Sequence, residues 1–249
     1  MTIGLNPLHL CQLNAYIMTK TDLQHADYRI RKLIGALGLL LPFALPLANL
    51  GFLASISHYY YIKAPSLIFI IVLSAFGLFL ISYKGYIIDK KSEKFSDNFI
   101  TNIGGLAALV VVIVPTHCGD SMSTSIQAIC ENGPYPLFGH ADDLKNTIHL
   151  VAAGIFILSM GWMSSFKFTR GSDKKNHILY KWCGYSVFIS IGLIIVFIGI
   201  EKLTDEPFFL KDYYVYVFET TAVVPFGISW LVKGKAIDDL RDLGRGMFS

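Results

Sequence analysis

Seven residues with side chains that bind ligands or transfer protons lie near the ends of apolar segments in this 249-residue chain. These candidate site residues are Ser57, His58, His117, Asp120, His149, Glu201 and Glu219. Imidazoles and carboxylates ligate metals and exchange protons near neutral pH, and hydroxyl groups bind polar ligands. Whether the seven act together depends on the elements that carry them.

The elements predicted around these residues are membrane-spanning helices. The chain is 53% hydrophobic and 16% charged, with a mean hydropathy of +0.52, which is too apolar for an ordinary soluble domain. Six apolar runs are long enough to cross a bilayer: Leu33–Ser55, Ser66–Tyr83, Phe99–Pro115, Ile148–Phe166, Trp182–Ile200 and Tyr213–Val232. The runs are continuous rather than alternating, which disfavours barrel strands. We therefore expect an all-α fold, a polytopic transmembrane bundle of six helices.

The distribution of positive charge predicts the orientation of the bundle. With six crossings, 17 of the 21 lysines and arginines fall on the face that holds both termini. This bias places both termini in the cytoplasm, in a cell (inner) membrane. The predicted organisation is a cytoplasmic arm over residues 1–32, a transmembrane domain over 33–232 with an outer loop at 116–147, and a cytoplasmic tail over 233–249. In the arm, Thr21 and Gln24 suggest a capping box that starts a helix leading into the first span.

This orientation brings the candidate residues to one membrane depth. Ser57 and His58 end the first span, His117 ends the third and His149 opens the fourth. Glu201 ends the fifth, and Glu219 lies about six residues, or roughly 9 Å, inside the sixth. A carboxylate within a span is costly, so Glu219 should face the bundle interior and have a partner, for which His149 and His58 are the first candidates. Tyr59, Tyr60 and Tyr61 fit an interfacial aromatic belt.

Two of the four cysteines lie in the outer loop, twelve positions apart. Oxidation is permitted on that face, so Cys118 and Cys130 are predicted to form a disulfide. Closing a loop of this size is worth about 3 kcal/mol and would hold His117 and Asp120 near the bilayer surface.

Several functions fit this cluster. The leading interpretation is a site for a membrane lipid or a small polar ligand. An alternative is a zinc-dependent lipid hydrolase in which His58, His117 and His149 hold the metal and a water lies near Asp120 or Glu219, although no fixed ligand spacing is present. A third is a structural hydrogen-bonded plug without a ligand. Haem is disfavoured because the histidines lie at span ends rather than at mid-depth.

Other chemistries have no sequence signature here. The chain has no glycine-rich phosphate loop and no Gly-x-Ser-x-Gly nucleophile elbow, so nucleotide chemistry is not expected, and nucleic acid is not an expected partner.

One stretch of the sequence resembles a known family. Val114-Pro115-Thr116, the outer loop with Asp120, and Ile148-His149-Leu150-Val151-Ala152-Ala153 resemble bacterial multi-pass membrane proteins of domain-of-unknown-function family 998. The chain is also similar to the Frag/DRAM/Sfk six-span class, some members of which are linked to lipid-anchor remodelling. The resemblance implies that His149 and Asp120 are family-like positions and implies no reaction. A more distant likeness to the alkaline-ceramidase and adiponectin-receptor superfamily favours zinc, but the last span lacks that group's paired His-x-x-x-His.

Overall fold

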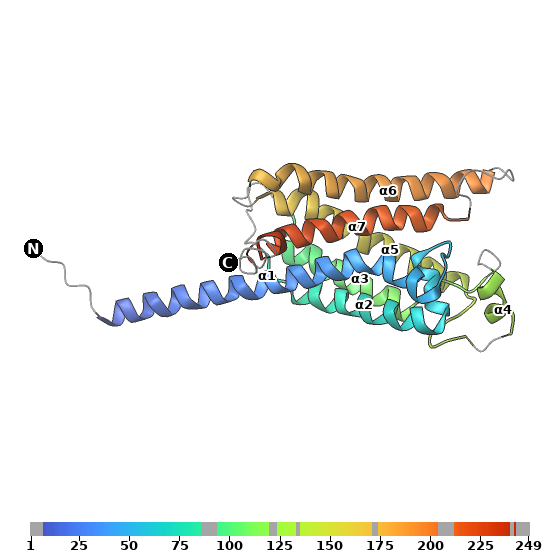
Figure 1. The fold of residues 1–249 in the computed structure, drawn as a ribbon, viewed down its shortest axis with the longest axis horizontal. Helices are drawn as coiled ribbons and strands as arrows, with labels where there is room; N and C mark the ends of the chain where they lie inside the picture. The colour runs from blue at the N-terminus through green and yellow to red at the C-terminus, as the bar shows by residue number, and fades with distance from the viewer. Residues whose placement is uncertain are drawn as a thin grey trace, which may run out of the picture.

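The computed structural model describes residues 7–85, 94–119, 124–132, 135–170, 174–203, 212–239 and 242, and these ranges contain helices and no strand. The long helices are α1 (Pro7–Asn49), α2 (Lys63–Ser82), α3 (Asp97–Ile113), α5 (Asp143–Trp162), α6 (His177–Leu203) and α7 (Tyr214–Lys233). The shorter elements are η1 (Ile56–Tyr61), α4 (Thr124–Asn132), the π-helical η2 (Met163–Lys167), η3 (Phe168–Arg170) and η4 (Lys174–Asn176). The predicted all-α fold is confirmed, and the long helices pack side by side as a bundle (Figure 1).

Within these described ranges, five helical segments are long and apolar enough to cross a membrane. They are the apolar part of α1 from Tyr28 to Asn49, α2, the segment Asp143–Arg170 that begins with α5, the segment Lys174–Glu201 within η4 and α6, and α7. The remaining long helix, α3, is apolar but has only 17 residues. Five of the six predicted spans thus meet the length and composition criterion, which fits a multi-pass membrane protein.

Large apolar side chains are exposed along the outside of the bundle. Leu40 of α1, Leu67 of α2, Leu106 of α3, Leu150 of α5 and Ile195 of α6 each leave more than half of their surface uncovered. Water-soluble monomers rarely expose so continuous an apolar surface. The exposed surface therefore suits a hydrocarbon surrounding.

The two ends of the bundle hold different segments of the chain. Helix α3 lies between α2 and α5, and α7 packs against α1 and α6. The start of α1 and the end of α7 lie at one end of the bundle, and α4 lies at the other (Figure 1). We call the latter the α4 end. The helix ends and connecting segments that carry the candidate residues lie there.

Helix α1 is longer than the sequence predicts. It runs without a break from Pro7 to Asn49 and extends well beyond the rest of the bundle (Figure 1). The predicted start at Thr21 is wrong because the helix is already formed there, and no break separates the predicted arm from the first span. The apolar run of the first span continues to Ser55, but the helix ends at Asn49.

Two prolines near the end of α1 create a backbone acceptor that another helix uses. Because Pro46 has no N–H, it cannot donate to the carbonyl of Pro42 one turn earlier. The hydroxyl of Tyr216 on α7 donates to that carbonyl instead. The backbone N–H of Tyr216 also donates to the Ala54 carbonyl at 2.9 Å. These bonds fix the beginning of α7 against the segment that leads into η1.

Glycines allow the helices to approach closely. A Cβ on Gly35 of α1 would lie 2.8 Å from the Gly227 carbonyl oxygen of α7. A Cβ on Gly105 of α3 would lie 2.6 Å from the Gly77 carbonyl oxygen of α2, and one on Gly104 would lie 2.2 Å from Ser159 Oγ. Close approach through small residues is typical of helices packed in lipid. Gly104 and Gly105 thus let α3 pack closely against α5 and α2.

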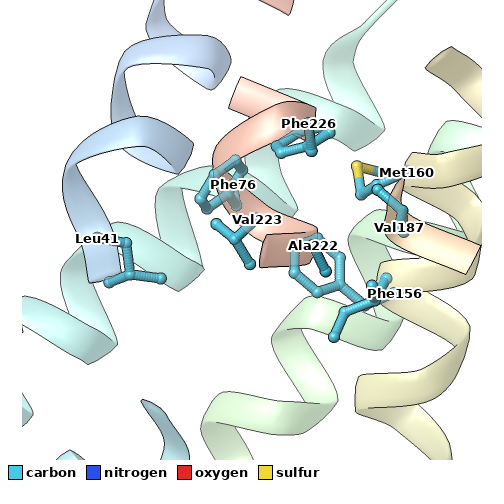
Figure 2. A pocket seen from close by; sticks show the side chains of 9 residues that line it. Leu41, Phe76, Phe156, Met160, Val187, Ala222, Val223 and Phe226 are labelled. Carbon is cyan, nitrogen blue, oxygen red and sulfur yellow. The ribbon is translucent and has the colours of Figure 1, made fainter. Parts of the chain in front are cut away.

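The centre of the bundle is apolar. Phe76 lies between Phe156 and Phe226, with ring centroids 5.8 and 5.7 Å away. A cavity of about 20 Å³ beside these rings is lined by apolar side chains from five helices (Figure 2). A space of this size and lining is expected to stay dry. Its lining offers no polar group for chemistry, so the polar groups at the α4 end are the place to look for a functional site.

Candidate functional site

The α4 end is organised around η1, the short 3-10 helix between α1 and α2. Ser55 precedes η1 in an extended conformation, and its hydroxyl oxygen accepts a hydrogen bond from the Ser57 N–H at 3.1 Å. Serine is favoured at this position because its oxygen satisfies a backbone donor that the helix leaves open. The cap starts η1 and thereby orients Ser57 and His58.

His149 joins three elements at the α4 end. It lies in the second turn of α5 and is 2% exposed. Its Nδ1 lies 2.8 Å from the carbonyl oxygen of Val114, just after α3, and its Nε2 lies 3.0 Å from the hydroxyl oxygen of Ser57. A carbonyl oxygen can only accept, so Nδ1 carries the hydrogen. In the neutral ring Nε2 is then an acceptor, and the Ser57 hydroxyl donates to it.

Glu219 of α7 binds the start of η1. Its carboxylate oxygens lie 3.0 and 3.1 Å from Ser55 Oγ, and one of them accepts the Ile56 N–H at 2.7 Å. The predicted need for a partner is therefore met by a hydroxyl and a backbone amide, not by His149 or His58. Through Ser55, the carboxylate is joined to the serine that contacts His149.

His58 and His117 complete the polar groups near His149. His58 directly follows Ser57, the serine that contacts His149, in η1. Within the described part of the chain, His58 Nδ1 is buried without a hydrogen-bond partner. The His117 ring lies against Gly119, where a Cβ would be 2.0 Å from His117 Nε2. The His117 N–H donates to Asn146 Oδ1 at 3.1 Å, which ties this segment to α5.

The three tyrosines of η1 are buried rather than arranged as an aromatic belt. Tyr59, Tyr60 and Tyr61 are each at most 2% exposed. The Tyr61 hydroxyl donates to the Thr116 carbonyl, and the Tyr60 hydroxyl accepts the Phe138 N–H at 3.2 Å. The belt prediction failed because the chain folds loops over these rings, which gives each hydroxyl a local partner.

The predicted disulfide is confirmed. Cys118 and Cys130 are joined, with their Cα atoms 5.3 Å apart. The Cys118 N–H also donates to the His140 carbonyl at 2.7 Å. Together these bonds fix the segment that carries His117 over the α4 end of the bundle.

Burial keeps the side chains of η1 neutral. Burial, followed by the nearby His149 and His117, lowers the pKa of His58 to about 4. Burial raises the pKa of Tyr59 and of Tyr61 to about 12. At neutral pH, η1 therefore presents a neutral imidazole and neutral phenols.

The remaining predicted residues do not join this network. Glu201 is exposed at the end of α6 and accepts a hydrogen bond from Tyr214 at 2.8 Å. Asp120 lies outside the described residues. Among the residues that the structure does describe, no three His, Cys, Asp or Glu side chains converge to hold a metal ion. His58, His117 and His149 are near one another but do not form such a group.

Sequence reasoning missed three residues that shape the site. Ser55 binds Glu219 and caps η1, Asn146 accepts from both Thr116 and His117, and His140 is 6% exposed with its Nδ1 accepting the Asp142 N–H at 3.1 Å. The Ser-x-Ser spacing of Ser55 and Ser57 is a usable signal for a capped turn. Asn146 and His140 carry no comparable signal.

Comparisons with known proteins found no matching family model, no matching curated protein and no matching solved structure. The resemblance to domain-of-unknown-function family 998 and to the Frag/DRAM/Sfk class therefore stays a prediction. Function must be argued from the site itself.

Proposed function

We propose that this protein is a six-span membrane protein that binds a lipid at the α4 end, with the lipid's polar part beside His149 and an acyl chain between α3 and α5. The observation that carries the proposal is the position of His149. It follows directly after Thr147 and Ile148, which line an apolar groove on the outside of the bundle. One turn of α5 thus carries both a buried polar network and the end of an apolar groove.

The groove has the shape and lining for a hydrocarbon chain. Its volume is about 430 Å³, and its lining includes Leu106 and Val110 of α3 and Val151 and Ile155 of α5. Both helices expose large apolar side chains next to it. In a bilayer the surrounding molecules at this position are lipids, so an acyl chain is the occupant that matches the surface.

Two observations support six crossings with cytoplasmic termini. Helix α3 has 17 residues, which is about the shortest length that spans a bilayer. It also lies between α2 and α5. The lysine and arginine bias puts the α4 end on the non-cytoplasmic side.

The zinc-dependent hydrolase is less well supported by the residues present. Both ring nitrogens of His149 are engaged, Nδ1 with Val114 and Nε2 with Ser57. A zinc ion at either nitrogen would have to displace one of these bonds. The proposed function therefore uses no metal.

Lipid retention by the purified full-length protein tests the proposal. The protein would be transferred from nanodiscs of phosphatidylethanolamine and phosphatidylglycerol into mild detergent, and retained lipid counted by native mass spectrometry. Val151→Trp fills the groove, whereas Val196→Trp alters a similarly exposed valine on α6. We expect wild type and Val196→Trp to retain lipid and Val151→Trp to lose most of it. Equal retention in all three would refute the site.

A further inference from the structure

The hydrogen bond between Ser57 and His149 has a direction that suits catalysis. The Val114 carbonyl holds the hydrogen of the imidazole on Nδ1, so Nε2 faces the Ser57 hydroxyl as a base, at 3.0 Å. An activated nucleophile requires a serine within hydrogen-bond reach of a base that a third group orients. Here the orienting group is a backbone carbonyl rather than a carboxylate.

The surroundings of the pair also fit this chemistry. His149 is 2% exposed, whereas Ser57 is half-buried, so the base is enclosed and the nucleophile is the more accessible partner. The Ser57 N–H donates to Ser55 Oγ, and Ser55 in turn contacts Glu219, which fixes the backbone under the nucleophile.

The residue that follows the proposed nucleophile carries a buried polar atom of its own. His58 follows Ser57 in η1, and among the described residues its Nδ1 is buried without a hydrogen-bond partner. A buried polar atom in this condition is unusual in folded proteins. Its position directly after Ser57 makes His58 the residue to test for stabilising an oxygen that becomes negative in the reaction.

We propose that Ser57 is a nucleophile and His149 its general base in metal-independent hydrolysis of a carboxylic ester of a membrane lipid. The choice of a lipid ester rests on the proposed lipid site, since the groove beside His149 would hold the acyl chain. The pair lacks the Gly-x-Ser-x-Gly signature, and it is recognised by geometry alone.

The reaction balances with water as co-reactant. As Ser57 Oγ bonds to the ester carbonyl carbon, its proton moves to His149 Nε2. The carbon–oxygen bond to the alcohol then breaks, and the alcohol oxygen takes that proton, which leaves an acyl-serine. Water attacks the acyl carbon and gives a proton to Nε2, the fatty acid leaves, and Ser57 Oγ regains the proton.

The first test is covalent labelling of the full-length protein by an alkyl fluorophosphonate, with the labelled peptide identified by mass spectrometry. We expect label on Ser57 in wild type and in Ser66→Ala, whose hydroxyl bonds the Lys63 carbonyl within its own helix. Ser57→Ala should lose the label, and His149→Gln should be labelled on the order of 10³-fold more slowly. Unlabelled Ser57 in wild type, or equal rates in wild type and His149→Gln, would overturn the dyad.

The second test separates the dyad from the lipid site. Release of fatty acid from phosphatidylglycerol in nanodiscs should fall to background in Ser57→Ala and stay at the wild-type rate in Ser66→Ala. Retained lipid without labelling or hydrolysis in wild type would refute the dyad and leave the lipid site standing. Labelled Ser57 without retained lipid would refute the lipid site and, with it, the choice of a lipid ester. Unlabelled Ser57 in wild type overturns the dyad even if a variant fails to fold.

Discussion

The two ends of the bundle bury polar groups in different ways. Where α7 finishes, permanent charges are buried against one another and against aromatic rings. At the α4 end, neutral groups and one carboxylate are joined by hydrogen bonds. Asp97, 1% exposed, pairs with Arg170 and lies 3.6 Å from Lys167. Lys233 donates to the Phe168 carbonyl at 2.8 Å and lies over the Tyr180 ring.

The contrast separates a structural cluster from a chemical one. The charges around Asp97 are compensated by ion pairs and rings, and such a cluster is sensitive to the loss of any one member. At the α4 end, the Ser57 hydroxyl and the His149 imidazole are neutral partners that can exchange a proton. The first cluster stabilises the fold, and the second is the one on which the proposed ligand site and dyad depend.

The largest effect on stability is expected from Asp97→Asn. It leaves Arg170 and Lys167 near a neutral amide, and we expect a loss of about 4 kcal/mol in the free energy of unfolding. Equilibrium unfolding by sodium dodecyl sulfate in mixed micelles measures this change. Asp239→Asn is the matched control, since its ion pair with Lys32 is exposed and should be worth less than about 1 kcal/mol. Equal effects of the two substitutions would end the contrast between the bundle ends.

Cys118→Ser is expected to cost about 3 kcal/mol, because it opens the loop that carries His117. The same unfolding measurement without reductant detects the loss. Dithiothreitol should reduce wild type to the stability of the variant and leave Cys118→Ser unchanged. A variant as stable as oxidised wild type would show that the loop adds nothing to this end.

Ser55→Ala removes both the cap of η1 and the hydroxyl that binds Glu219, and should cost about 2 kcal/mol. Ser66→Ala, which removes a hydroxyl bonded within its own helix, should change stability by less than about 0.5 kcal/mol. If both variants unfold alike, η1 does not depend on its bond to α7.

The pH dependence of stability sharpens the comparison further. Unfolded His58 takes a proton near pH 6.5 and folded His58 near pH 4, so between these values the unfolded state binds more protons. Stability should therefore fall, by about 3 kcal/mol, as the pH is lowered from about 6.5 to about 4. His58→Asn should lessen this slope, and Lys233→Met at the other end should leave it unchanged. An unaltered slope in His58→Asn would show that another group causes the pH dependence of stability.

The sequence predicts the helices better than the contacts between them. Hydropathy located α7 to within one residue at each end, because a continuous apolar run needs no tertiary information. Hydropathy misplaced the end of the first span, since Ser55 is as compatible with the apolar run of that span as with the cap of η1. It also missed the start of α1 at Pro7. The disulfide was predictable because two cysteines share one short loop.

The sequence predicted which candidate residues share one end of the bundle but not how they pair. Ser57, His58, His117, His149 and Glu219 all lie at the α4 end, as expected from alternating spans. The bond from Glu219 to Ser55 and the bond from Ser57 to His149 depend on how η1 turns, and on the loops folded over Tyr61. Neither the turn of η1 nor the fold of these loops can be predicted from hydrophobic periodicity or residue spacing.

Photo-crosslinking of a bound lipid tests the central claim most directly. Wild-type protein in nanodiscs would be irradiated with a phosphatidylglycerol that carries a diazirine near the ester end of one acyl chain. We predict crosslinks concentrated on the peptides that hold Thr147–Val151 of α5 and Leu106–Val110 of α3. Crosslinks spread over α1 and α6 at the same density as over these peptides would contradict a lipid site at the α4 end.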